Sequence, residues 1–349
     1  MKLSIMTLIL VISAALSFGQ DAPARFTGFQ KVGYIAQEGV EFRRPVISPN
    51  GRWITFTSNA MGHALWMARS GDLKPTLLVK REGLGEIRRS AWSPDSQQIA
   101  YVDGRTVKLI DVVSRKVVSK STVSPFMSDP MFDAEGNLFV IGNTDLIGNK
   151  TALEGDLELV KAMTPNDRPY LVAIGRGGKV FGDQEGERRF RGPNVIVPYI
   201  LSLGDRLEAY LRIGDQDKKI TPPTIGDYPP KCLEVLLSPD RDKVVMYCIQ
   251  VKSRLSVYEI STGKYHYNLG TIADPRCWSP DSEWVLYAEE ISDGHAVDWN
   301  DLYVVHYTGG KRMKIARAKG TVYGASWGKN GLIAYDEEGK IVIGKLVVK

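Results

Sequence analysis

The clearest pattern along the chain is a recurring cassette of two strand-like apolar runs joined by a short polar turn. Residues 41–56 (EFRRPVISPNGRWITF) are echoed by residues 86–101 (EIRRSAWSPDSQQIAY). Further cassettes occupy residues 236–247 and 277–287, and weaker copies occupy residues 131–139 and 326–335. Proline fixes the backbone of the turn and Asp or Asn caps it, while β-branched and aromatic residues fill the second run. Each cassette therefore predicts a β-hairpin.

In the better copies two more strand-like runs follow the cassette, as residues 64–68 and 76–79 do after the first one. Four antiparallel strands that recur about every 40 to 50 residues are the unit of a β-propeller blade. We therefore predict an all-β fold, in which residues 20–349 form a single β-propeller of four-stranded antiparallel blades.

The cassettes, of the form aliphatic-Trp-Ser-Pro-Asp-Gly followed by Ile-Ala-Phe, resemble the WD-like repeats of TolB-type propellers. Similar repeats occur in the propellers of prolyl-oligopeptidase and tricorn relatives. The resemblance covers nearly the whole chain after the first residues and implies the fold much more specifically than the function. TolB itself carries an α/β domain before its propeller, whereas the first cassette of this chain already begins at residue 41.

The spacing of the cassettes bears on the number of blades. The turns that start at Ser48, Ser93, Asp133, Ser238, Ser279 and Gly328 are separated by 45, 40, 105, 41 and 49 residues. The long gap has room for one unmarked blade and an insertion, which favours seven blades; six is the alternative if this region decorates a single blade. Only two strands fit after the last cassette, so we expect the N-terminal strand, residues 31–36, to complete that blade and close the ring.

The first segment has the pattern of an export signal. Lys2 precedes an apolar run over residues 3–18, and the small residues Ser17 and Gly19 lie before Gln20. This run is short for a membrane span, so we predict a signal peptide over residues 1–19, with an uncleaved anchor as the alternative. The mature chain is then expected in the periplasm or outside the cell, with no transmembrane segment.

Composition narrows the partners and the chemistry. The chain has 45 Lys and Arg against 40 Asp and Glu, a net charge of +5 that is too weak and too evenly spread to indicate nucleic acid. Three cysteines and four scattered histidines argue against a zinc or disulfide framework and against most histidine-dependent chemistry. If the hairpin turns at residues 239–242, Cys232 lies nearly opposite Cys248; a disulfide and buried thiols are then equally open, and one cysteine stays unpaired.

The positions just before each first strand are the best candidates for a binding site, because in a propeller they line the mouth of the central channel. The candidate rim residues are Arg43, Arg44, Arg88, Arg89, Asp129, Glu234 and Arg276. Arginine suits carboxylate or phosphate, so we expect an anionic peptide or ligand at this rim. Mutual salt bridges between blades are the alternative.

Two further motifs are weaker candidates. Asp293, Asp298 and Asp301 lie in one long loop and could hold Ca²⁺ through their oxygens, with a solvated loop as the alternative; no other cofactor is expected. Residues 324–328 (GASWG) fit the Gly-x-Ser-x-Gly nucleophile elbow, but the run falls in a first strand and no histidine follows it, so we interpret it as structural.

The absence of a recognisable catalytic set favours a monomeric, non-catalytic propeller. We expect it to bind a protein or peptide partner through its channel rim, as part of a cell-envelope assembly. The alternative is a propeller-shaped lyase or hydrolase that acts on a polysaccharide or a peptide in the channel. A third interpretation, a propeller accessory to a separate catalytic chain, differs from the first only in its partner.

Overall fold

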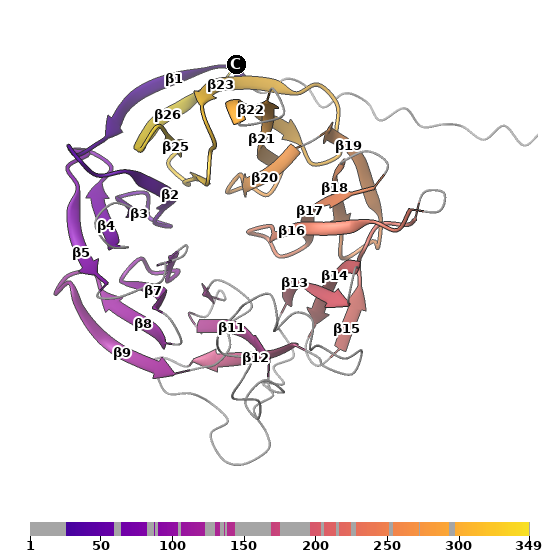
Figure 1. Ribbon diagram of the computed structural model, residues 1–349, viewed down its shortest axis with the longest axis horizontal. Helices are drawn as coiled ribbons and strands as arrows, with labels where there is room; N and C mark the ends of the chain where they lie inside the picture. Colours follow the sequence, from indigo (N-terminus) through magenta and orange to yellow (C-terminus); the bar gives the residue numbers. More distant parts are fainter. Residues whose placement is uncertain are drawn as a thin grey trace, which may run out of the picture.

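The computed structural model is a ring of antiparallel β-sheets around a central axis, and the residues that it describes contain no helix (Figure 1). The structure describes residues 26–58, 64–81, 87, 90–103, 106–122, 130–132, 136, 138–143, 169–174, 196–203, 206–213, 216–224, 228–250, 254–271, 273–292 and 297–348. Within those ranges no helix is long and apolar enough to cross a membrane. The predicted signal peptide lies outside them.

Five of the sheets have four strands each, in the order of a propeller blade. The first is β2 (Phe42–Ile47), β3 (Trp53–Ser58), β4 (Ala64–Arg69) and β5 (Thr76–Lys80). The second is β6 (Ala91–Trp92), β7 (Gln98–Asp103), β8 (Thr106–Asp111) and β9 (Lys116–Thr122). Later in the chain come β16 (Lys231–Leu237), β17 (Lys243–Ile249), β18 (Arg254–Glu259) and β19 (Tyr265–Thr271), then β20 (Ala273–Trp278), β21 (Trp284–Ser292), β22 (Val297–His306) and β23 (Met313–Lys319). The all-β propeller fold with four-stranded antiparallel blades is thus confirmed.

The long gap between cassettes holds two sheets with three strands each in the described part of the chain. They are β10 (Met131–Phe132), β11 (Leu138–Asn143) and β12 (Pro169–Ile174), and β13 (Ile196–Leu203), β14 (Arg206–Ile213) and β15 (Gln216–Lys219). The expectation of seven four-stranded blades is therefore wrong for the described residues, where each sheet of this stretch has three strands.

The remaining sheet contains strands from both ends of the chain, and we call it the terminal sheet. It consists of β24 (Ala325–Trp327), β25 (Leu332–Glu337), β26 (Lys340–Val348) and β1 (Phe26–Ile35). Strand β1 runs antiparallel to β26, with Phe26 opposite Val348 and Ile35 opposite Ile341. A Cβ at Gly344 would lie 2.1 Å from the ring of Phe29, so only glycine leaves room for this ring on β26.

The core consists of apolar side chains between neighbouring sheets. Phe42 packs edge-to-face on Phe56 and Trp66, with ring centroids 4.6 and 5.4 Å apart. The same cluster includes Ile35 and Leu332 of the terminal sheet, so it joins the first four-stranded sheet to the last. Burial of each such side chain contributes about 1.5–3 kcal/mol.

The turn of the cassette bonds to the next sheet along the chain. The Ser48 hydroxyl donates to the side-chain oxygen of Asn50 (2.8 Å), and the backbone amide of Asn50 donates to the hydroxyl of Ser96 in the next turn (3.1 Å). The indole of Trp92 donates to the Val46 carbonyl (3.2 Å) across the same interface. A later pair of sheets repeats these bonds, from the Asp240 amide to Ser282 (2.9 Å) and from Trp278 to the Leu236 carbonyl (3.0 Å). The cassette therefore recurs because its residues join adjacent sheets.

Candidate functional site

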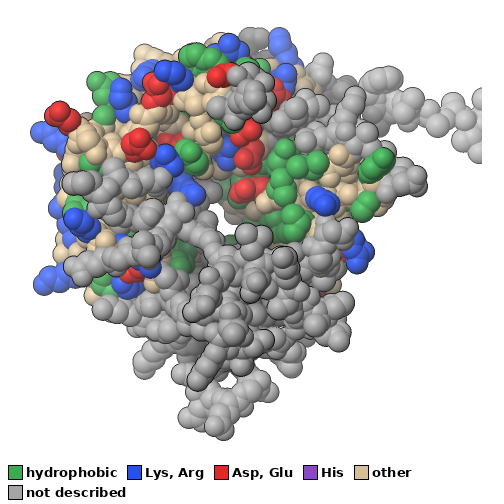
Figure 2. All heavy atoms as spheres, viewed as in Figure 1, with side chains coloured by type: hydrophobic (Ala, Val, Ile, Leu, Met, Phe, Trp, Pro, Cys, Tyr) green, Lys and Arg blue, Asp and Glu red, His purple; other side chains and the backbone are tan. Residues whose placement is uncertain are grey.

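Each first strand begins at the end of the ring opposite the Ser-Pro-Asp-type turns. We call these two ends the channel mouth and the turn end. Figure 2 shows that the ring is hollowed near its centre, with acidic and basic side chains on one side of the hollow and hydrophobic ones on another. The register of the first strand shifts near the mouth in three sheets, between Arg43 and Val46, after Cys232, and after Pro275. Such bulges redirect side chains and are frequent beside functional sites.

The charged side of the mouth is built around Asp336 on β25. Its carboxylate accepts the backbone amides of Arg44 (2.7 Å) and Tyr323 (2.6 Å), and its side chain is almost fully buried, with the residue 1% exposed. Burial raises the pKa of this carboxyl to about 6, although the two amides and the charges of Arg276 and Arg43 oppose the shift. Asp336 therefore fixes the backbone of the mouth rather than facing the channel.

The backbone that Asp336 holds is strained at Arg44, which has a φ of 54°. Residues other than glycine are uncommon in this left-handed region of backbone conformation, and Arg44 adopts it within the bulge between Arg43 and Val46. Gly324 leaves room for the backbone of Arg44, because a Cβ at position 324 would lie only 3.0 Å from the Cα of Arg44. The bulge thus depends on residues from the first and the terminal sheets together.

Arg43 extends from this bulge onto an exposed aromatic ring. Its guanidinium lies 4.1 Å from the centroid of Tyr323, and one of its nitrogens lies 3.1 Å from a carboxylate oxygen of Glu41. A cation held against a ring face is attracted by the ring quadrupole. Tyr323 therefore orients Arg43 at the mouth.

Arg276 approaches the same carboxyl from β20. Its guanidinium pairs with Asp274 (2.9 Å), and its side chain is 10% exposed. Its Nε atom is buried and has no hydrogen-bond partner among the residues that the structure describes. Burial raises the pKa of Asp274, and pairing with Arg276 only partly offsets this shift. A buried polar nitrogen without an acceptor is an exception in folded proteins, and it is commonly explained by an ordered water or ion.

The expected rim residues divide into three groups. Arg43, Arg44 and Arg276 come together around Asp336. Arg43 forms its ion pair with Glu41 and Arg276 forms its ion pair with Asp274, each within its own sequence segment. Glu234 lies half-buried on β16, in another sheet. Arg88, Arg89 and Asp129 lie outside the described residues. The structure thus assembles one part of the rim.

The residues of the expected Ca²⁺ loop are not brought together in the described part of the chain. Asp301 accepts hydrogen bonds from Arg317 (2.7 and 2.9 Å) and Lys314 (2.6 Å), which lower its pKa to about 2. Asp298 is exposed, and Asp293 lies outside the described residues. No group of three or more His, Cys, Asp or Glu side chains suited to a metal occurs within the ranges given above.

The Gly-x-Ser-x-Gly motif has a structural role between two sheets. The hydroxyl of Ser326 accepts the backbone amide of Ile47 (3.0 Å), and a Cβ at Gly328 would lie 2.8 Å from the Ile47 side chain. Ser326 is buried on β24. The motif therefore fits the last sheet against the first, as the sequence interpretation required.

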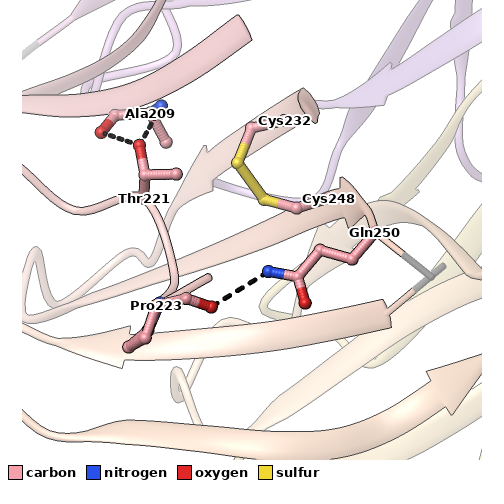
Figure 3. The surroundings of a disulfide bond; sticks show 6 residues. All are labelled: Ala209, Thr221, Pro223, Cys232, Cys248 and Gln250. Atoms are coloured by element: carbon pink, nitrogen blue, oxygen red, sulfur yellow. Dashed lines mark hydrogen bonds between the residues drawn. A yellow bond between two sulfur atoms is a disulfide. The ribbon is translucent and has the colours of Figure 1, made fainter. Parts of the chain in front are cut away.

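The other side of the mouth is fixed by a disulfide. Cys232 on β16 is bonded to Cys248, its cross-strand partner on β17, which settles the open alternative in favour of a disulfide (Figure 3). Gln250 donates to the Pro223 carbonyl (3.0 Å), and Thr221 exchanges hydrogen bonds with the backbone of Ala209 (2.9 and 3.2 Å). Cys277 remains a buried thiol.

Asp336 and Tyr323 are the residues that sequence reasoning missed. A signal for Asp336 existed, because the fifth position of the second strand is otherwise uncharged. By register, the equivalent residues in four other cassettes are Thr57, Val102, Tyr247 and Ala288. A lone carboxylate in a buried strand position indicates a specific partner.

No known protein family and no curated protein matches the sequence. An oligogalacturonate lyase from Vibrio parahaemolyticus is 11% identical, with a TM-score of 0.66 over 91% of this chain and 97% of that one. An oligogalacturonate lyase in complex with manganese is 15% identical, with a TM-score of 0.62 over 94% and 98%. Hydrazine synthase from Kuenenia stuttgartiensis is 10% identical, with a TM-score of 0.59 over 90% and 98%.

At these identities the likeness concerns the fold, and membership of the TolB-type family is not confirmed. The expectation of a non-catalytic propeller that binds a protein partner was nevertheless wrong as the leading interpretation. Two of these three similar structures are lyases, so the alternative, a propeller-shaped lyase, agrees better with the comparisons. The chain is similar in fold to catalytic propellers.

Proposed function

We propose that the protein is a propeller-shaped lyase that acts on an acidic polysaccharide at the channel mouth. The observation that carries this proposal is the pair of guanidinium groups of Arg43 and Arg276, whose charges both act on Asp336 at the mouth. The planar fork of a guanidinium matches a carboxylate, the group that distinguishes a uronate from a neutral sugar. The fold shared with two lyases supports the same class of reaction.

The chemistry of elimination suits a cationic site. A base removes the proton on the carbon beside the uronate carboxylate, the electron pair forms a carbon–carbon double bond, and the glycosidic carbon–oxygen bond breaks as the leaving oxygen takes up a proton. Negative charge grows on the carboxylate as the first proton leaves, so fixed cations there lower the barrier. Arg276 and Arg43 would bind this carboxylate, while Asp274 and Tyr323 position the two guanidiniums.

Hydrolysis fits the described mouth less well. A glycoside hydrolase needs two accessible carboxyl groups that flank the scissile bond. Here Asp274 is paired with Arg276, and Asp336 is buried under two backbone amides. The charged side of the mouth therefore favours elimination over attack by water.

A divalent metal could supply the same charge neutralisation when bound, and one similar lyase is in complex with manganese. The described residues of this chain do not fit such an ion, since no suitable group of metal-ligating side chains is found among them. No step of the proposed reaction is therefore routed through a metal.

The test is an elimination assay with a panel of acidic polysaccharides, in which the unsaturated uronate product is followed by its ultraviolet absorbance. We expect Arg276→Gln to lower the rate roughly 10- to 100-fold, because a hydrogen bond to a charged group contributes about 1.5–3 kcal/mol. Arg69→Gln is the matched control, since the Arg69 guanidinium also lies over a ring (Trp53, 5.0 Å) but at the turn end.

Two results would contradict the proposal. If the wild-type protein releases no unsaturated product from any acidic polysaccharide, the lyase assignment is wrong. If Arg276→Gln and Arg69→Gln retain the same activity, the reaction takes place elsewhere on the molecule.

We further propose that the mature chain works in the periplasm or outside the cell after cleavage before Gln20. The pattern of Lys2 and the apolar run over residues 3–18 supports this location. Sequencing the N-terminus of the protein recovered from a secreting host tests it, and an intact Met1 in that fraction would contradict it.

A further inference from the structure

The side of the mouth away from Arg43 and Arg276 is apolar. Tyr228 is 65% exposed and Leu233 is 46% exposed, and Ile249 is exposed beside them at the end of β17. Figure 2 shows hydrophobic side chains gathered over β16 at the edge of the central hollow. Large side chains exposed together mark a surface that binds something. We call Tyr228, Leu233 and Ile249 the apolar arc.

The register of the strands explains why the arc faces outward. Cys232 and Cys248 are buried and bonded to each other, Leu233 lies at the bulge between Cys232 and Glu234, and Ile249 follows Cys248 at the end of β17. A bulge redirects its side chain, and Ile249 points to the face opposite Cys248. The neighbouring sheet continues the apolar surface, because β21 extends beyond the start of β20 and ends in the exposed cross-strand pair of Ile291 and Trp299.

The arc is held rigidly. The disulfide fixes the start of β16, and Gln250, which directly follows β17, donates to the Pro223 carbonyl (Figure 3). Prolines 229 and 230 restrict the backbone that follows Tyr228. A surface ordered before binding loses little conformational entropy when a ligand arrives.

The arc is continuous with the proposed substrate site. By register, Glu234 pairs with Tyr247 as Arg43 pairs with Thr57 and Asp274 with Ala288, so Leu233 lies at the bulge directly before this mouth position. A polysaccharide bound at Arg276 and long enough to cross the mouth would therefore extend over Leu233.

The chemistry of the arc selects an uncharged occupant. A carboxylate placed on the ring face of Tyr228 and the side chain of Leu233 would lose water without gaining a hydrogen bond from these apolar surfaces, and the carboxylate of Glu234 on β16 would repel it. The carbon–hydrogen face of a pyranose ring, or a methyl ester on it, can instead pack on the ring of Tyr228 and the side chain of Leu233.

We propose that the apolar arc is a subsite for uncharged sugar units, neutral or methyl-esterified, which neighbour the acidic unit bound by Arg276 and Arg43. This inference rests on the proposed function and extends it, because it assigns the protein a partly esterified or mixed polysaccharide rather than a fully acidic one.

The test compares binding of two uronate oligosaccharides of equal length, one fully de-esterified and one partly methyl-esterified, by calorimetry. The double variant Tyr228→Ala/Leu233→Ser should bind the esterified probe about tenfold more weakly and the de-esterified probe with less than about a twofold change. Tyr34→Ala is the matched control, since Tyr34 is 57% exposed but lies on the outer strand β1, and it should change neither affinity.

The outcomes separate the subsite from the function. Equal weakening for both probes, or no weakening for either, overturns the subsite while the lyase proposal stands on its own assay. If the wild-type protein binds neither probe, both proposals are overturned. If the double variant binds both probes normally but loses a concentration-dependent dimer, the arc contacts a second copy of the chain and the subsite is wrong. Because the substituted side chains are exposed, we expect the variant to fold, and its melting temperature checks this.

Discussion

The two ends of the ring are built on opposite principles. At the turn end the same bonds recur, and Ser48, Ser238 and Ser279 donate to the polar side chain two residues later at 2.8, 2.5 and 2.5 Å. At the mouth the first-strand residue that pairs with the fifth residue of the second strand is Arg43, Glu234 or Asp274, so its charge differs from sheet to sheet. The repeated end joins the sheets, whereas the varied end can recognise a ligand without altering the frame.

The largest expected contrast concerns stability. Trp278→Ala should lower the free energy of unfolding by about 3–5 kcal/mol, because it leaves a cavity in a buried site and removes the bond to the Leu236 carbonyl. Tyr323→Ala, at the exposed end, should cost less than about 1 kcal/mol. Urea denaturation of both variants measures the difference. Comparable losses would show that the mouth carries as much of the frame as the turn end does.

A smaller effect should appear in the pH dependence of the mouth. The pKa of Asp336 is raised from 3.8 to about 6 in the folded protein, so the native state binds its proton more readily than the unfolded chain. Relative to Asp336→Asn, the wild type should therefore gain about 3 kcal/mol as the pH falls from 7 to below 3, with most of the gain reached by pH 4. Denaturation of both proteins across this range tests it, and a difference independent of pH would refute the assignment.

The turn end should respond to acid in the opposite direction. Burial, aided by Lys264, lowers the pKa of His266, and Glu259 at 3.7 Å opposes this. The groups that face His266 are Glu259, Lys264, His306 and Tyr307. Because the native state binds this proton less readily, the wild type should lose stability relative to His266→Gln as the pH falls below the ordinary value of 6.5.

Melting temperatures of the two proteins at pH 7.5 and pH 5 measure this smallest effect, with both values chosen to lie about one unit or more on either side of the ordinary histidine pKa. A wild-type protein that gains stability in acid relative to His266→Gln would contradict the lowered pKa. The signs at Asp336 and His266 would then no longer distinguish the two ends.

Local sequence was sufficient for the hairpins and much of the ring. The Ser-Pro-Asp-type turns and their flanking strands follow from spacing and residue type. Arg43, Arg44 and Arg276 were recognised as rim residues because their position before each first strand is periodic. Asp336 and Tyr323 were missed, since nothing in their own cassette indicates which backbone amides or side chains they meet.

The sequence by itself determined the all-β repeat, because turn geometry and strand propensity act over a few neighbouring residues. The tertiary structure alone decided that Arg43 and Arg276 approach one buried carboxyl and that Cys232 is bonded to Cys248 on a sheet that bears an apolar arc. Arg44 and Asp336 lie at opposite ends of the chain, and they meet because the last sheet packs against the first. Contacts of that range depend on how the ring of sheets is arranged, which no local pattern contains.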